Sequence, residues 1–120
     1  MTAPVDFSVD ERDEEGVRVL AVAGELDIAT APSLCARLDA SRAARQPRLV
    51  VDLSGVEFCD STGLRALLGA ASEVHTHGGR FALVCRPEGN VARLLDIVGA
   101  SELIAIHPDR DAALSAVARA

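Results

Sequence analysis

Two neighbouring segments with different hydrophobic periodicity constrain the fold of this chain most strongly. Residues 48–53 (RLVVDL) are rich in branched apolar side chains and lie between Pro47 and a Ser-Gly pair, which predicts a buried strand. After a predicted loop at residues 54–60, apolar side chains recur at helical spacing from Ser61 to about Thr76, which predicts an amphipathic helix. The apolar positions of this helix are Leu64, Leu67, Leu68, Ala71 and Val74. A buried strand that leads into an amphipathic helix is typical of α/β proteins.

The N-terminal part of the chain has the pattern of an antiparallel hairpin. Apolar and polar residues alternate over residues 5–9, and after a charged turn at residues 10–16 a second strand is predicted at residues 17–23, closed by Gly24. Six of the 18 acidic residues lie within residues 1–15. This acidic cluster predicts a solvated turn, with a docking patch as the alternative.

The remaining strand and helix patterns alternate along the chain. We predict helices at residues 30–44, 90–98 and 109–119, and strands at residues 80–85 and 103–106. Strands that alternate with helices pair in parallel through crossover connections. The sequence therefore predicts a single α/β domain over residues 1–120. Its mixed β-sheet is expected to consist of an N-terminal antiparallel hairpin and then parallel strands, covered by about four helices.

The composition of the 120 residues excludes several classes of partner. Hydrophobic residues make up 49% of the chain, which is enough for a core, and the net charge is −6. A negative charge repels nucleic-acid phosphates and anionic lipid surfaces. The aromatic content is 2%, without Tyr or Trp, so the stacking platforms of single-stranded nucleic-acid binders are missing. We therefore expect protein partners, with no nucleic acid and no membrane.

The three cysteines, Cys35, Cys59 and Cys85, are widely spaced and form no CxxC pair. This spacing argues against a thioredoxin-type site and against a zinc ribbon, so each cysteine is predicted to be a small buried hydrophobe. The N-terminus has no basic segment followed by an apolar signal core, and no uninterrupted apolar stretch reaches about 18 residues. We expect a cytoplasmic protein with no metal and no cofactor.

Signatures of catalysis are missing from the sequence. It contains no GxGxxG or GxxxxGK[ST] loop that would bind nucleotide phosphates, and Ser61 lies in CDSTG, which lacks the first glycine of a GxSxG nucleophile elbow. His75 and His77 are two residues apart on a predicted helix, where a metal pair needs a spacing of three or four. These histidines are expected to place favourable charge near the helix C-terminus. The chain is thus not expected to be an enzyme, and a small hydrolase or phosphotransferase that uses Ser61 or Cys59 is the alternative.

Two polar segments follow neighbouring predicted strands. Gly24, Glu25, Leu26 and Asp27 follow the strand at residues 17–23, and Phe58-Cys59-Asp60-Ser61-Thr62-Gly63 comes after the strand at residues 48–53. Because loops at the carboxyl ends of parallel strands gather at one edge of a sheet, these segments are expected to meet. Asp, Ser and Thr before a helical run are typical capping residues. A hydroxyl at this helix N-terminus is also accessible to another protein and tolerates a phosphate, and both interpretations stay open.

Three segments of the sequence together resemble one protein family. They are GELDIATAP at residues 24–32, VVDLSGVEFCDSTGLRALL at residues 50–68 and VARLLDIVGASELIAI at residues 91–106. These segments are similar to the STAS-domain family, in particular to the bacterial anti-sigma factor antagonists, and the resemblance covers nearly the whole chain. It implies the STAS fold and a phosphorylated serine that matches Ser61.

The resemblance also implies the partners of the chain. They are an anti-sigma factor, which is a serine protein kinase with bound ATP, and a protein phosphatase. The unmodified antagonist would bind the kinase and release a sigma factor, and phosphorylation at Ser61 would prevent binding. A STAS subunit of a transport, lipid-trafficking or stress-signalling complex without a kinase switch is the alternative. We expect the chain to be a monomer.

The predicted site combines the resemblance with the positions of the residues in the sequence. Its partner-binding members are Glu25, Asp27, Asp60, Thr62, Gly63, Leu64 and Arg65. Thr62 is the rival phosphorylation site, because on a helical wheel it points away from the apolar face and is predicted to be more exposed than Ser61. Arg65 follows Ser61 by four residues, so its guanidinium could pair with a phosphate on Ser61.

Overall fold

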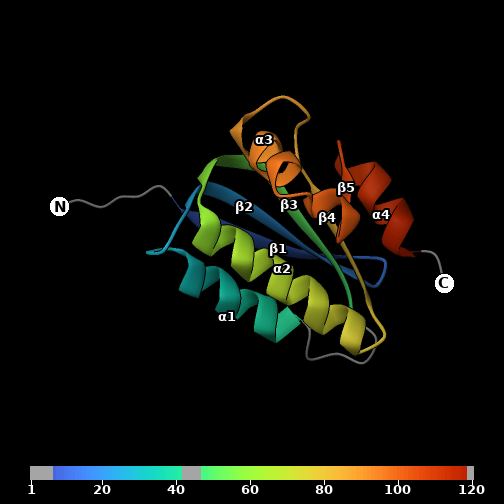
Figure 1. Ribbon diagram of the computed structural model, residues 1–120. Helices are drawn as coiled ribbons and strands as arrows, with labels where there is room; N and C mark the ends of the chain where they lie inside the picture. Colours follow the sequence, from blue (N-terminus) through green and yellow to red (C-terminus); the bar gives the residue numbers. More distant parts are fainter. Residues whose placement is uncertain (1–6, 42–46, 119–120) are drawn as a thin grey trace.

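The structure is a computed structural model that describes residues 7–41 and 47–118 (Figure 1). Five strands form one sheet in the order β1-β2-β3-β4-β5, in which β1 is antiparallel to β2 and all other neighbours are parallel. The strands are β1 (Ser8–Glu14), β2 (Val17–Leu26), β3 (Arg48–Cys59), β4 (Arg80–Val84) and β5 (Ala105–His107). The helices are α1 (Ala31–Ser41), α2 (Ser61–Thr76), α3 (Asn90–Ile97) and α4 (Arg110–Ala118), with a 3₁₀ turn η1 (Ala100–Glu102). The predicted mixed sheet with four helices is confirmed.

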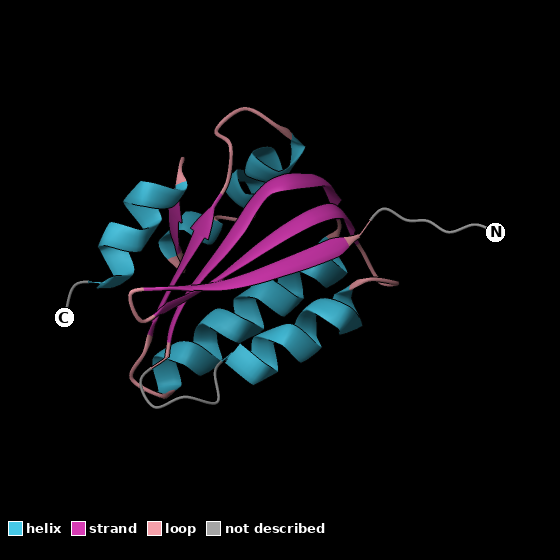
Figure 2. Cartoon of the chain, turned by 180° about the vertical axis from the view of Figure 1, so that it is seen from behind, coloured by secondary structure: helices cyan, strands magenta, loops and turns pink. Residues whose placement is uncertain are grey.

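The alternation of side chains along the strands sends apolar residues into two separate cores. In β2, Leu20 and Val22 pack with α1 and α2 on one face of the sheet, whereas Val17 and Val19 pack with α4 on the other. Helix α3 joins the larger core through Val91 and Leu95. Figure 2 shows the sheet from behind, with strands and helices in separate colours. Both faces of the central strands are therefore buried, as expected for parallel strands rich in valine and leucine.

The hairpin is longer than predicted. The charged turn expected at residues 10–16 is wrong for most of its length, because β1 continues to Glu14 and only Glu15 and Gly16 form the turn, both with positive φ. An edge strand accommodates acidic residues because its side chains are exposed and charge there opposes pairing with other chains. Residues 5 and 6 of the predicted first strand lie outside the described residues.

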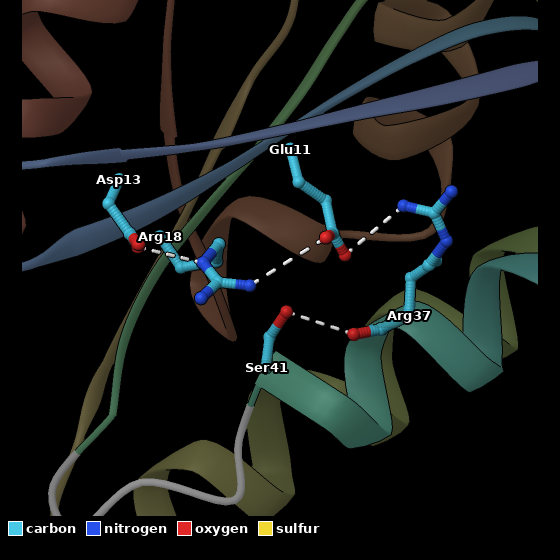
Figure 3. Close-up of polar contacts among 5 residues, drawn as sticks. All are labelled: Glu11, Asp13, Arg18, Arg37 and Ser41. Carbon is cyan, nitrogen blue, oxygen red and sulfur yellow. Dashed lines mark hydrogen bonds and ion pairs between the residues drawn. The ribbon is translucent and has the colours of Figure 1, made fainter.

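The acidic side chains of β1 are engaged within the molecule (Figure 3). The Arg18 Nε lies 2.8 Å from an oxygen of Asp13, and one Nη of Arg18 lies 3.8 Å from Glu11. Glu11 also lies 3.1 Å from a terminal nitrogen of Arg37 on α1. These side chains are partly exposed, so each pair contributes at most about 1 kcal/mol. The network therefore helps to orient α1 on the hairpin, while the apolar core supplies most of the stability.

The third strand contains a second difference from the prediction. Residues 54–59, which were expected to form a loop, continue β3, and β2 likewise runs past Gly24 to Leu26. The pairing of β2 and β3 continues to Leu26 and Cys59 across two register shifts, one between Ala21 and Ala23 and one between Gly24 and Glu25. Bulges of this kind are set by the partner strand, so the local Ser-Gly turn signal does not reveal them. As a result the carboxyl ends of β2 and β3 lie side by side.

The other boundaries agree closely with the sequence pattern. Helix α2 has the predicted bounds, and the predicted extension of α1 over residues 42–44 lies outside the described residues. Strand β4 and helix α3 each end one residue earlier than expected, and α4 begins one residue later. Residue 119 of the predicted last helix lies outside the described residues. The 3₁₀ turn η1 was not predicted. Strand β5 follows it at Ala105–His107 and not at the predicted residues 103–106.

A partly buried ion pair between Asp52 in β3 and Arg110 in α4 holds α4 on the sheet. Asp52 is only 8% exposed. Its Oδ2 accepts hydrogen bonds from Arg110 Nη2 at 2.8 Å and from Arg110 Nε at 3.2 Å. Its Oδ1 accepts a hydrogen bond from the Ser54 N–H at 2.9 Å. Burial opposes ionisation of Asp52, but the hydrogen bonds from Ser54 and Arg110 outweigh it and lower the pKa of this carboxyl.

Candidate functional site

Helix α2 begins at a capped N-terminus with an exposed serine. Asp60 has an extended backbone, and its Oδ1 accepts a hydrogen bond from the Gly63 N–H at 3.0 Å. Asp60 is therefore the N-cap, and Ser61 is the first residue of the helix. The Ser61 side chain is exposed and makes no hydrogen bond to any residue within 7–41 or 47–118. Its hydroxyl is thus free of the capping role that the sequence had left open.

The relative exposure of Ser61 and Thr62 is opposite to the prediction. Ser61 is exposed, whereas Thr62 is only partly so. The helical wheel placed Thr62 only by its angle to the apolar face of α2. In the structure the first turn of the helix also packs against Leu26 at the end of β2. Geometry therefore agrees with the resemblance in favouring Ser61 over Thr62 as the accessible hydroxyl.

Gly63 allows α2 to approach β2 closely. A Cβ atom added to Gly63 would lie 2.6 Å from Leu26 Cγ and 2.9 Å from the Leu26 carbonyl oxygen. The Asp60 N–H donates to that same oxygen at 3.1 Å. Gly63 is buried, and Leu64 belongs to the larger core. Both were predicted as partner-binding residues, which stays a prediction, and their burial shows that they also position the first turn of α2.

The loop after β2 is held by hydrogen bonds between Asp27 and Thr30. Asp27 Oδ1 accepts from the N–H groups of Ala29 at 3.0 Å and Thr30 at 3.1 Å. The Thr30 hydroxyl accepts from the Asp27 N–H at 2.9 Å and donates to the Glu25 carbonyl at 2.8 Å. The carboxylate of Asp27 thus shapes the entry to α1, a role that the sequence analysis did not assign to it.

The two polar segments meet as expected. Leu26 pairs with Cys59 across β2 and β3, and Glu25 pairs with Phe58. The loop after β2 and the first turn of α2 therefore lie next to each other. We call residues 25–30 and 57–65 together the carboxyl edge. In Figure 1 it lies where β2 and β3 meet the start of α2.

Negative charge predominates at the carboxyl edge. Its acidic residues are Glu25, Asp27, Glu57 and Asp60, and its only basic residue is Arg65. Glu25, Glu57 and Arg65 are exposed. Arg65 forms no ion pair or hydrogen bond within the described part of the chain. The edge is thus suited to a partner that presents basic groups.

The thiol of Cys59 is a poor nucleophile in this environment. Burial, together with the neighbouring Asp60 carboxylate, raises the pKa of Cys59 to about 11. The thiol is therefore protonated near neutral pH, and a protonated thiol does not attack. Cys35 and Cys59 are half-buried and Cys85 is buried, so the prediction of buried cysteines is right for Cys85 only.

Two exposed apolar side chains at the carboxyl edge were missed by sequence analysis. Ile28 is 73% exposed in the loop after β2, and Phe58 is 48% exposed near the end of β3. Ile28 had a detectable signal, because it interrupts the polar segment between Asp27 and Thr30. Phe58 lies in a segment that was expected at this edge, but its exposure had no signal, since its strand was predicted to end at Leu53.

Residues 7–41 and 47–118 contain neither a candidate metal cluster nor a candidate membrane-spanning helix. Within them, no group of three or more His, Cys, Asp or Glu side chains could hold a metal ion. None of the described helices is both long and apolar enough to cross a bilayer. His77 lies at the C-terminus of α2, with its Nδ1 2.8 Å from the Glu73 carbonyl oxygen, as the sequence had suggested for a helix end.

Comparison with known proteins gives consistent matches. The model of the STAS domain matches residues 8–113. The anti-sigma-F factor antagonist RsfB of Mycobacterium tuberculosis is 40% identical over 93 residues, which are 78% of this chain and 74% of RsfB. The anti-sigma F factor antagonist of Paenibacillus polymyxa is 30% identical over 112 residues, 92% of this chain and 95% of that protein. The crystal structure of an anti-sigma factor antagonist from Mycobacterium paratuberculosis has a TM-score of 0.86 and 35% identity, covering 99% of this chain and 100% of that one.

Proposed function

Because this chain belongs to the STAS domain family, we propose that it acts as an anti-sigma factor antagonist whose binding is switched off by phosphorylation of Ser61. The unmodified chain would bind an anti-sigma factor that is a serine protein kinase with bound ATP, and would free a sigma factor. A protein phosphatase would restore the unmodified form. In this role the protein is a cytoplasmic monomer and not an enzyme.

The observation that supports the proposal is the hydroxyl of Ser61, which is exposed at the carboxyl edge and makes no hydrogen bond within the described residues. The serine has no structural hydrogen bond within the described residues, so its modification would break none. A phosphate there would lie at the N-terminus of α2, where the helix dipole favours an anion by about 0.3 to 1 kcal/mol. The fold is therefore expected to tolerate the phosphate.

The same phosphate would disfavour a protein partner. It adds a charge of about −1.5 to −2 directly after Asp60 in the chain, on an edge that already carries four carboxylates. For each unit of negative charge that the partner places about 7 Å away, for example on its bound ATP, Coulomb's law at an effective dielectric of about 40 to 80 gives about 1 to 2 kcal/mol of repulsion. This corresponds to about a five- to thirtyfold loss of affinity per unit charge, before the desolvation of the phosphate is counted. A switch of this size needs no large conformational change.

Arg65 is the residue of the carboxyl edge best suited to respond to the phosphate. It is exposed on α2, four residues after Ser61, and no described residue pairs with it. Positions four apart lie on the same side of a helix, and a guanidinium forms charge-assisted hydrogen bonds with phosphate oxygens. In the proposed cycle, Arg65 stabilises the phosphorylated form and competes with contacts to the partner.

The proposal is tested by measuring sigma-factor release. The anti-sigma factor is identified by capture on the immobilised chain and mass spectrometry, and is then purified in complex with its sigma factor. The unmodified chain and Ser61→Ala are expected to displace the sigma factor, whereas Ser61→Asp is not. Ser72 is an exposed serine further along α2, so Ser72→Asp is the matched control and should act like the wild type. Equal displacement by Ser61→Asp and the wild type would contradict the switch.

A further inference from the structure

The exposed apolar side chains of the described residues fall into two groups. Ile97, Val98 and Leu103 lie at the end of α3 and around η1, away from the carboxyl edge in sequence. Ile28 and Phe58 both belong to the carboxyl edge, on either side of the pairing between β2 and β3. Ile28 lies in the loop after β2 and Phe58 near the end of β3, so the carboxyl edge combines two large exposed apolar side chains with polar ones, as an interaction surface does.

The backbone connects Ile28 and Phe58 to Ser61 through few bonds. Leu26, two residues before Ile28, pairs with Cys59, the residue after Phe58. The Leu26 carbonyl also accepts the Asp60 N–H at 3.1 Å, directly before Ser61. Both apolar side chains therefore lie on segments fixed to the start of α2.

Ile28 is presented on a rigid loop. Its neighbours are joined by a hydrogen bond from the Ala29 N–H to Asp27 Oδ1 at 3.0 Å, and Asp27 and Thr30 are linked at 2.9 and 3.1 Å. A loop that is already ordered loses little conformational entropy when it binds, so contact energy from its side chain appears almost fully as affinity. Ile28 is thus well placed to insert into a pocket of a partner.

We infer that Ile28 and Phe58 are the apolar anchors with which this chain docks on its anti-sigma factor, and that the partner presents an apolar pocket bordered by basic side chains. The inference rests on the proposed function and adds the chemistry of the partner surface. Apolar anchors surrounded by polar groups are the usual source of binding energy in protein interfaces. Glu25 and Glu57, both exposed, provide the acidic surroundings that a basic rim would complement.

The charge of the carboxyl edge favours a different protein over a second copy of this chain as the partner that binds there. A second copy of this chain would bring the same acidic edge against itself, with Glu25, Glu57 and Asp60 facing equal charges. Like charges placed together across an interface cost free energy, and the net charge of −6 adds to this repulsion. A different protein with a basic surface therefore fits the edge better than a homodimer does.

The anchors explain why a phosphate on Ser61 would be effective. Once Ile28 and Phe58 are seated, water is displaced from the surface around the start of α2. A dianion in that place would lose hydration, and any basic group that pairs with it would be drawn from its contact with the carboxylates of the edge. A phosphate already present on Ser61 would thus weaken the docking of the anchors.

The experiment compares two isoleucines of equal exposure. Ile28 is 73% exposed at the carboxyl edge and Ile97 is 74% exposed at the end of α3, so Ile97→Ala is the matched control for Ile28→Ala. Each variant is titrated with the purified anti-sigma factor identified by the capture experiment, and its melting temperature is measured. We expect Ile28→Ala to bind about tenfold more weakly or worse, Ile97→Ala to bind within about twofold of the wild type, and neither to lose its fold.

Two further measurements complete the test. Phe58→Ala is expected to weaken binding at least about tenfold, and higher salt is expected to weaken wild-type binding because it screens the basic rim from the acidic edge. Equal affinity of Ile28→Ala and the wild type, or a salt-independent affinity, would overturn this inference while the proposed function stands. A wild-type chain that binds no anti-sigma factor would overturn the proposed function, and this inference with it.

Discussion

Substituting Gly63 by alanine tests how α2 is seated on β2. The added Cβ would lie 2.6 Å from Leu26 Cγ and 2.9 Å from the Leu26 carbonyl oxygen, closer than such atoms approach in proteins. Relief requires a shift of Leu26 or of the first turn of α2, and overpacking of this kind costs about 1 to 3 kcal/mol. Alanine returns up to about 1 kcal/mol of helix propensity. The net expectation is a loss of about 1 to 2 kcal/mol in the free energy of unfolding.

Gly69 is the matched control in the same helix. A Cβ atom at Gly69 would meet no atom within 4 Å, so Gly69→Ala should gain helix propensity without a clash. Its expected effect is a stabilisation of about 0.5 to 1 kcal/mol. Thermal or urea unfolding of both variants measures the two changes, which have opposite signs. Gly63→Ala as stable as Gly69→Ala would refute the close approach of α2 to Leu26.

Two further predictions concern arginines. Arg110→Ala leaves the buried Asp52 carboxylate without its charged partner and should destabilise the fold by about 1 to 3 kcal/mol near pH 7. Because the pKa of Asp52 is lowered in the folded protein, this contribution is full above the unfolded pKa of about 4 and disappears as the pH falls below it. Urea unfolding at several pH values measures it, and a pH-independent difference would argue against the ion pair. Arg65→Ala should lower the stability of the Ser61-phosphorylated chain by about 0.3 to 1 kcal/mol and leave the unmodified chain unchanged. Equal shifts of the melting temperature in both forms would exclude pairing with the phosphate.

Local signals account for the parts of the fold that the sequence predicts well. Helix α2 combines a strong apolar period with Asp60 as a capping residue directly before it, so both its start and its extent are encoded within one segment. The end of β3 depends on a different kind of information. Ser54 and Gly55 look like a turn, and only the bulged pairing with β2 keeps these residues in the strand.

The candidate site shows the same division. Ser61 was selected from its motif and the resemblance, and the structure leaves it exposed, although the helical wheel had predicted Thr62 to be the more exposed of the two. The burial of Gly63 depends on how closely Leu26 approaches, which is a tertiary contact with no local signature. Phe58 became recognisable as an exposed side chain of the edge only when β3 was known to reach Cys59. Motifs thus locate the chemistry, while the surface around it follows from packing between distant segments.

Whether phosphorylation of Ser61 switches off binding is decided by the dissociation constant of the chain for its anti-sigma factor, measured with and without phosphate on Ser61. Modification is carried out with the partner kinase and ATP, and its position is established by intact mass and fragment mapping. We expect the phosphate on Ser61, and an affinity for the anti-sigma factor that is at least about tenfold lower for the modified chain. Equal dissociation constants for the two forms, or phosphate found on Thr62 in place of Ser61, would contradict it.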